Sequence, residues 1–455
     1  MKLAKALLVI ASILVTGFFM VSSDTNYTGA IAFCLLLWSL FFAFIMDKPL
    51  ASVLLMIISL HWFQLDGMTI TLYFIPVAVI LFLLYALNRR ELRMDKAVLA
   101  AVAIILGHMG LVLLIKPFPI EYIFFYINAV CFVFFWGSSL FKWDSAKVQT
   151  ILNAHLAFMI GWGFIERVLS SAPRIEGPAL SSTNFAVMLV VAWTIWLVNG
   201  LLERHYKWAT LGIGSLLVLV VVLFSGTRMG LLGMGLCGVL MIICKLYLKY
   251  ERQVMRFLVY FTISFAAFCA FAYVVWQLLP DDLFLKQGMM TFLSGKLDMS
   301  SLGRLGAWAT ALDIIHTDPM WGVGPGNFMV RNKMLLDAYS MIPIVEITPR
   351  LGHAHNVVLL VLSEQGFVGF AALGSFCLIG LYYLLRCIWR YKSGLGLALL
   401  CGGIVTLFLG MFDVFPLFPS SLVWGAWYMS VLYSLRGYEG EPDAKLPETK
   451  EVTPK

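Results

Sequence analysis

Charged residues are scarce in this sequence. Asp, Glu, Lys and Arg make up 13% of its 455 residues, whereas hydrophobic residues make up 61% and the mean hydropathy is +0.90. Soluble globular domains carry about 25% charged residues, so a soluble fold is excluded. Because the apolar runs are continuous and do not alternate with polar residues, they predict membrane-spanning helices and not the strands of a membrane barrel.

Closely spaced acidic residues and paired polar cysteines are also lacking. All eight cysteines fall within or at the ends of apolar runs, which argues against a disulfide framework and against a cysteine metal site. Asp281, Asp282 and Asp298 lack the spacing of a calcium loop, and no Asp-x-Asp pair follows the first apolar run. We therefore expect no metal and no cofactor.

Long apolar runs fill most of the chain and predict an all-α polytopic membrane protein. A helix needs about 20 apolar residues to cross a bilayer, and about 14 runs approach that length. Three of them are short enough to be tilted or interfacial, so 12 spans remain the alternative. The runs are Ala4–Val21, Gly29–Met46, Leu50–Leu65, Thr69–Leu87, Ala97–Ile115, Tyr122–Phe141, Val148–Ser170, Thr183–Leu202, Ala209–Phe224, Met229–Leu246, Phe257–Leu279, Val357–Leu385, Leu395–Phe412 and Ser420–Leu435.

These runs divide the chain into four parts. Residues 1–279 form the first part of a transmembrane bundle, residues 280–356 a large extracytoplasmic loop, and residues 357–436 the last transmembrane helices. The tail of residues 437–455 is charged, contains proline and has few apolar residues, so it is predicted to be disordered. Neither an internal repeat nor a matched pair of broken helices is visible, which argues against a carrier built from inverted repeats.

The basic residues indicate which side each loop occupies. With the N-terminus in the cytoplasm, clusters such as NRRELRMDK, KLYLKYERQVMR and RCIWRYK all fall inside, and the cytoplasmic loops and termini hold about two-thirds of the lysines and arginines, as the positive-inside rule expects. Both termini are then cytoplasmic, and residues 280–356 lie outside. In a membrane protein the placement of Lys and Arg matters more than the net charge of +7, and no nucleic-acid partner is expected.

Three outer loops each bring an arginine close to a helix end. Arg174 lies in APRIEGPALSSTN, Arg228 in the short turn SGTRMG, and Arg304 at the start of a predicted helix. Arginine presents a planar fork of donors and stays charged, so several arginines suit a diphosphate held near the membrane. Alternatively, each arginine anchors its loop at lipid headgroups or pairs with a nearby carboxylate such as Glu166 or Glu176.

The outer segment combines a helix with a glycine-rich turn. The pattern GRLGAWATALDIIH at 303–316 predicts an amphipathic helix along the membrane surface, ended by Asp318 and Pro319. Its predicted apolar face consists of Leu305, Trp308, Ala309, Leu312 and Ile315. The glycines of WGVGPGNF at 321–328 predict a compact turn, and the alternative is that its backbone amides face an anion.

Two histidines follow this turn. His353 and His355 precede Asn356 and a long predicted helix that contains Glu364. An imidazole is the usual general base for taking a proton from an attacking hydroxyl, although a surface histidine at lipid headgroups is the alternative. Residues two apart point in opposite directions on a strand and about 200° apart on a helix, so only one histidine is expected to face a site.

Four of these motifs together resemble the O-antigen ligase and O-antigen polymerase superfamily of bacterial membrane glycosyltransferases. The motifs are RIEGPALSSTNFA, SGTRMGLLG, GRLGAWATALDIIHTDPMWGVGPGNF and HAHNVVLLVLSEQGFVGF, in that order. They cover the chain from Arg174 to roughly Leu385, whereas the first six apolar runs resemble the family only in hydropathy.

The resemblance implies particular site residues. Arg228 and Arg304 match diphosphate-binding arginines, and Arg174 matches a third. His355 matches the catalytic histidine, with His353 as the competing choice. The supporting positions that the resemblance implies are Gly322, Gly324, Asn327, Asn356 and Glu364.

The family further implies an inverting, metal-independent transfer of a glycan from undecaprenyl diphosphate to an acceptor sugar hydroxyl or lipid A core, at the outer face of the bacterial cytoplasmic membrane. Its partners would be this donor, the acceptor and membrane lipids. A ligase, a polymerase and a protein O-oligosaccharyltransferase all remain open, because the sequence constrains the acceptor site least. The alternative from another class is a flippase or exporter of lipid-linked glycans, but the span interiors offer mainly His61, His108 and His155 and almost no paired charges.

Overall fold

The structure, a computed structural model, describes residues 64–65, 68–69, 96–116, 127–133 in part, 143–170, 172, 174–177, 181–250, 253–278, 299–331, 353–415, 417 and 422–437. Almost all of the predicted spans before residue 88, most of the predicted span Tyr122–Phe141 and the tail beyond residue 437 lie outside these residues. The same holds for two parts of the predicted outer loop, residues 280–298 and 332–352.

Helices make up nearly all of the described part of the chain. They are α5 (Lys96–Ile115), α7 (Ser145–Leu169), α8 (Ser182–Leu202), α9 (Trp208–Ser225), α10 (Arg228–Tyr250), α11 (Val254–Leu278), α13 (Met299–Thr317), α16 (Val357–Tyr391), α17 (Gly394–Gly410), α18 (Leu422–Ser434) and the short 3-10 helix η2 (Leu435–Gly437). Two short strands, β1 (Gln64–Leu65) and β2 (Met68–Thr69), pair antiparallel with Gln64 opposite Thr69 and Leu65 opposite Met68.

Many of these helices are suited to a bilayer. Within the described residues, six are long and apolar enough to cross a membrane: α5 from Val98 onward, α7, α8, α9, α10 and α16. Helix α17 is apolar but shorter. The prediction of an all-α polytopic membrane protein is confirmed, whereas the total of 12 to 14 spans includes segments outside the described residues and stays a prediction.

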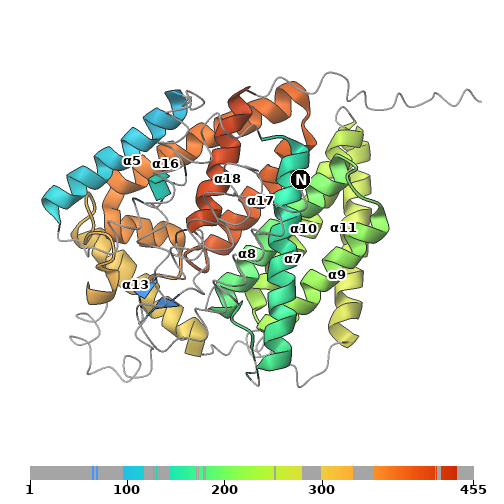
Figure 1. Cartoon of the computed structure of the whole chain (residues 1–455), viewed down its shortest axis with the longest axis horizontal. Helices are drawn as coiled ribbons and strands as arrows, with labels where there is room; N and C mark the ends of the chain where they lie inside the picture. The colour runs from blue at the N-terminus through green and yellow to red at the C-terminus, as the bar shows by residue number, and fades with distance from the viewer. Residues whose placement is uncertain are drawn as a thin grey trace, which may run out of the picture.

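Helix α8 is the centre of the bundle. It is apolar on all sides, and residues Asn184 to Gly200 are buried, which is the pattern of a helix enclosed by other helices. It packs against α17, α9, α10 and α7, while α5 and α13 lie along α16 on the other side of the molecule (Figure 1). The contact with α17 is close, since a Cβ at Gly402 would lie 2.3 Å from Ile195 Cγ1.

One end of the bundle collects the loops with the predicted site residues. Gly233, in the second turn of α10, lies against Val190 of α8 and Leu409 in the last turn of α17. The Asn356 side chain, just before α16, donates to the Met411 carbonyl, just after α17, at 3.0 Å. The starts of α8, α10 and α16 and the end of α17 therefore lie together, at what we call the site end.

The basic residues that the structure describes between these helices lie at the opposite end of the bundle. Because the packed helices joined by short connections run antiparallel, the α8–α9, α10–α11 and α16–α17 connections gather there (Figure 1). Lys116, after the end of α5, pairs with Asp318, after the end of α13, so the start of α5 also faces away from the site end. This separation of charge agrees with the positive-inside pattern, and which end is cytoplasmic stays a prediction.

Helix α16 is broken at Gly366, whose φ of 63° and ψ of −168° lie outside the helical region. The break leaves backbone N–H and carbonyl groups of α16 without partners inside the helix. The turn after α13 both donates hydrogen bonds to these carbonyls and accepts hydrogen bonds from these N–H groups. The four bonds run from Val323 N to Ser363 O (2.9 Å), from Gly324 N to Glu364 O (2.8 Å), from Phe367 N to Pro319 O (2.8 Å) and from Val368 N to Met320 O (3.2 Å). Unpaired backbone groups are costly inside a membrane protein, so this backbone clamp holds the end of α13 against α16.

Helix α13 covers the predicted segment 303–316 and ends before Asp318, but it begins earlier, at Met299, and it turns an unexpected face to the protein. Leu305 and Leu312, from the predicted apolar face, are 46% and 57% exposed. The buried face consists of Ala307, Ala311 and Ile314, which pack against Phe328 and Ala354. Small side chains allow the helix to approach its neighbours closely, and Leu305 and Leu312 are left pointing outward, where contact with the membrane stays a prediction.

The clamp predicts that Gly366→Ala unfolds more easily than the wild type. Its backbone conformation is almost confined to glycine, and a Cβ there would lie 2.2 Å from Met320 O, so we expect a loss of about 3 kcal/mol. The matched control is Gly374→Ala on the same helix, where nothing lies within 4 Å of the added Cβ. Thermal unfolding in detergent measures both variants, and equal unfolding temperatures for the two would contradict the clamp.

Candidate functional site

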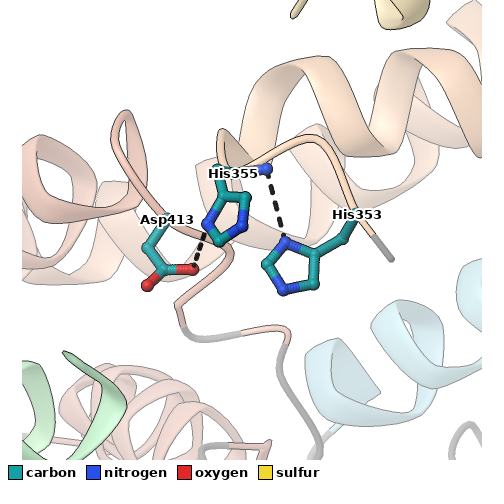
Figure 2. Close-up of side chains that lie close together, drawn as sticks. All are labelled: His353, His355 and Asp413. Carbon is teal, nitrogen blue, oxygen red and sulfur yellow. Dashed lines mark hydrogen bonds and ion pairs between the residues drawn. The ribbon is translucent and has the colours of Figure 1, made fainter. Parts of the chain in front are cut away.

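Both predicted histidines face the same place. The ring centroids of His353 and His355 are 4.1 Å apart, and the backbone N–H of His355 donates to His353 Nδ1 at 3.4 Å (Figure 2). The prediction that only one histidine would face the site is wrong. The backbone of His355 has a φ of 46° and lies in the left-handed region. The side-chain directions expected for a strand or a helix therefore do not apply to this pair of residues.

Asp413 completes this group from a distant part of the sequence. It lies shortly after α17, and its Oδ1 atom is 3.5 Å from His355 Nδ1 (Figure 2). The residue is 5% exposed, and its Oδ1 atom also accepts the backbone N–H of Val414 at 2.8 Å. Our sequence analysis missed Asp413, because a single acidic residue after an apolar run has no motif or spacing that links it to the histidines.

Burial and neighbouring charges set the protonation of this group. Burial lowers the pKa of His353 to about 4, with smaller contributions from His355 and Arg304 in the same direction and from Asp413 in the opposite one, so this imidazole is neutral at pH 7. Burial alone would raise the pKa of Asp413, but the facing imidazole of His355 and the nearby His353 together hold it below its usual value. An ionised carboxylate beside Nδ1 of His355 favours a proton on that nitrogen and leaves Nε2 as an acceptor.

Arg304 adds a positive charge to the same group. It lies in the second turn of α13, which the backbone clamp holds beside α16, and its charge acts on His353. Its Nε atom is buried and has no hydrogen-bond partner among the described residues. Buried guanidinium nitrogens normally have an acceptor, so this arrangement is suited to an anion.

Arg174 and Arg228 form a second cationic group. Arg174 Nε donates to the carbonyl of Ser225, in the last turn of α9, at 2.9 Å. Gly226 ends α9 with a φ of 63°, and Arg228 is the first residue of α10, where the helix dipole adds further positive potential. Burial and then the charge of Arg228 lower the pKa of Arg174, which means that the two guanidinium groups lie close enough to repel each other.

The predicted carboxylate partners of these arginines have different roles. Glu166 accepts the backbone N–H groups of Glu176 and Gly177 at 2.7 and 2.9 Å and therefore holds the loop in place. Glu176 acts electrostatically on Arg174 more weakly than Arg228 does.

The two groups lie at the same end of the bundle, the site end. The Arg174 and Arg228 group is attached to the start of α10, and the histidine group to the start of α16 and the end of α17. The contact between Gly233 and Leu409 joins these parts. The structure therefore gathers the predicted arginines and histidines at one end, with Asp413 added.

The predicted supporting residues hold the site together. Gly322 has a φ of 63° and no room for a Cβ beside Ser363 O, and Gly324 belongs to the backbone clamp. The Asn327 side chain donates to the Val323 carbonyl at 3.1 Å. The Glu364 carboxylate accepts the Phe328 N–H at 3.3 Å, and Asn356 caps α16 by accepting from Val358 N and Leu359 N at 3.0 Å each. The glycine turn is therefore a compact structural turn, as the sequence predicted, with amides directed at α16.

His353, His355 and Asp413 also meet the spacing needed to hold a metal ion, since one donor atom from each lies within 4.8 Å of the others. Imidazole and carboxylate donors of this kind suit zinc. However, Nδ1 of His353 already accepts a backbone N–H. The expectation of a metal-free site stays a prediction.

The fold and the site define a polytopic membrane protein with arginine, histidine and aspartate groups gathered at one end of its helix bundle. Residues 213–374 match the family model described as O-Antigen ligase. This match supports the resemblance to the O-antigen ligase superfamily of membrane glycosyltransferases for this part of the chain. The match contains Arg228, Arg304 and both histidines and excludes Arg174 and Asp413. A comparison with curated proteins finds no match.

The lowered pKa of His353 predicts acid-sensitive folding. In the unfolded chain His353 binds a proton below its ordinary pKa of 6.5, whereas the folded protein binds it only near pH 4, so its contribution to stability falls as the pH drops from about 6.5 to about 4. Removing this group in His353→Gln should make the unfolding temperature less dependent on pH in that range. Thermal unfolding in detergent between pH 7 and pH 4.5 measures the difference, and identical pH slopes for the two proteins would contradict it.

Proposed function

We propose that this protein transfers a glycan from undecaprenyl diphosphate to a hydroxyl of an acceptor sugar or lipid A core, with inversion and without a metal ion. The site end lies on the outer face of the bacterial cytoplasmic membrane, and the basic end and both termini lie in the cytoplasm. The observation that carries this proposal is the convergence of Arg304, His355 and Asp413 in one group, on the same end as Arg174 and Arg228.

The arginines bind the diphosphate of the donor. Two guanidinium groups that repel each other gain most from a ligand with several negative charges, because that ligand offsets the repulsion. The Nε atom of Arg304, which has no partner among the described residues, offers a further charge-assisted hydrogen bond. As the bond to the sugar breaks, negative charge grows on the diphosphate oxygens, so these groups stabilise the transition state more than the ground state.

His355 is the general base, and Asp413 orients it. The acceptor hydroxyl gives its proton to Nε2 of His355 while its oxygen forms the new bond to the anomeric carbon. The electron pair of the broken carbon–oxygen bond leaves with undecaprenyl diphosphate. His353 is neutral at pH 7, packs against His355, and accepts the backbone N–H of His355. We therefore assign His353 the role of positioning His355, and His355 the role of the base.

Purified protein, incubated with undecaprenyl-diphosphate glycan and with separate candidate acceptors, tests this proposal. The acceptors are lipid A core, a second lipid-linked glycan and a protein that carries acceptor hydroxyls, and mass analysis identifies the product. Transfer to either of the first two supports the proposal. Transfer to protein alone would indicate a protein O-oligosaccharyltransferase, and movement of intact donor between leaflets without transfer would indicate a flippase.

Arg228→Ala and Arg304→Ala should each lower kcat/KM at least as much as His355→Ala. Electrostatic stabilisation of a leaving diphosphate accounts for several kcal/mol, whereas a general base typically contributes about 10²-fold to 10⁴-fold. Arg256→Ala is the control, because Arg256 lies on α11 near the basic end and donates to Gln253. Normal transfer by a folded, inserted Arg228→Ala protein would refute this order.

A chelator should leave glycan transfer unchanged. The proposed chemistry uses guanidinium groups and an imidazole, so excess EDTA removes nothing that the reaction needs. The initial rate of transfer with and without EDTA measures this. Loss of activity that Zn²⁺ restores would instead assign His353, His355 and Asp413 to a metal site.

A further inference from the structure

Trp308 carries a polar group that the proposed reaction does not yet use. It lies on α13, and its indole nitrogen is buried without a hydrogen-bond partner among the described residues. Buried tryptophan N–H groups normally find an acceptor, as Trp193 does by donating to Ser215 Oγ at 3.0 Å. An unpartnered indole N–H at a ligand site is therefore available to an acceptor atom of the ligand.

The position of Trp308 places this nitrogen beside the candidate site. Residues four apart lie one above the other on a helix surface, so Trp308 is next to Arg304, whose Nε is also buried and unpartnered among the described residues. In the same turn, Ala307 belongs to the cluster that packs with Ala354, the residue between the two histidines. Two donors that lack a partner in the described part of the chain thus occupy adjacent turns of the helix that packs beside the histidine segment.

The two donors differ in charge, which indicates what each would bind. A guanidinium favours phosphate oxygens, whereas a neutral indole N–H suits an uncharged hydroxyl or ring oxygen. The backbone positions of Arg304 and Trp308 are about 6 Å apart along the helix axis, which is similar to the distance from a phosphate to the oxygens of the sugar attached to it. A flat, apolar indole ring can also lie against the carbon face of a sugar.

We propose that the Trp308 N–H binds an oxygen of the first sugar of the donor, the sugar attached directly to the diphosphate, while Arg304 binds the diphosphate. This inference rests on the proposed function. Trp308 is then a specificity-determining residue that fixes the orientation of the anomeric carbon relative to His355. The Trp308 N–H therefore does not contribute to the binding of undecaprenyl diphosphate that carries no sugar.

Affinity measurements with two lipids test this assignment. The wild type and Trp308→Phe, which keeps a ring and removes the N–H, are each titrated with undecaprenyl diphosphate and with undecaprenyl diphosphate carrying one sugar. We expect the substitution to weaken binding of the sugar-bearing lipid about tenfold, as for one lost hydrogen bond to a buried donor, and to leave binding of the bare lipid unchanged. In transfer assays the loss should fall mainly on KM for the donor, and Trp308→His, which keeps an N–H, should recover part of it.

A matched control comes from the other buried indole nitrogen that lacks a partner among the described residues, that of Trp427. It lies in the aromatic core against Trp143 and Trp424, so Trp427→Phe should not change either affinity. Equal binding of the sugar-bearing lipid by the wild type and Trp308→Phe would overturn the inference and leave the proposed function intact. An equal loss of affinity for both lipids would indicate that Trp308 contacts the diphosphate or contributes to folding, and it would also overturn the inference. Failure of the wild type to bind either lipid would overturn both proposals.

Discussion

The break in α16 at Gly366 is the constraint on which the histidine site depends. Inside a membrane protein, backbone groups released by a broken helix need partners, and here the turn after α13 supplies them through four bonds in both directions. This exchange fixes α13 against α16 at the level where α16 begins. Arg304 and Trp308 on α13 are thereby held beside the histidine segment that leads into α16.

The ends of other helices bring the remaining groups to the same place. Asn356 caps α16 and also reaches Met411, so the start of α16 and the end of α17 are tied together and Asp413 lies beside His355. Gly226, with its left-handed backbone, ends α9 and lets α10 begin at Arg228. The site is therefore assembled from helix ends held by a rigid bundle, which suits the fixed positioning of charge that transfer from a diphosphate requires.

The sequence predicts the described helices well, because their apolar runs and end signals are local. It also predicts Arg174, Arg228, Arg304 and the histidines at one end, since loops between alternating spans return to the same side. It fails for Asp413, whose neighbours come from a distant segment, and for the joint orientation of the histidines, which depends on the φ of 46° at His355. It also assigns Trp308 to an apolar face, because helical periodicity does not reveal which apolar side chains a neighbouring helix covers.

The most direct test of the central claim is an experimental structure of the protein bound to an undecaprenyl-diphosphate glycan in a lipid nanodisc. The account predicts that the diphosphate lies at the site end within hydrogen-bond distance of Arg228 and Arg304, with the anomeric carbon facing Nε2 of His355. A diphosphate bound at the basic end, or one that contacts neither arginine, would contradict it.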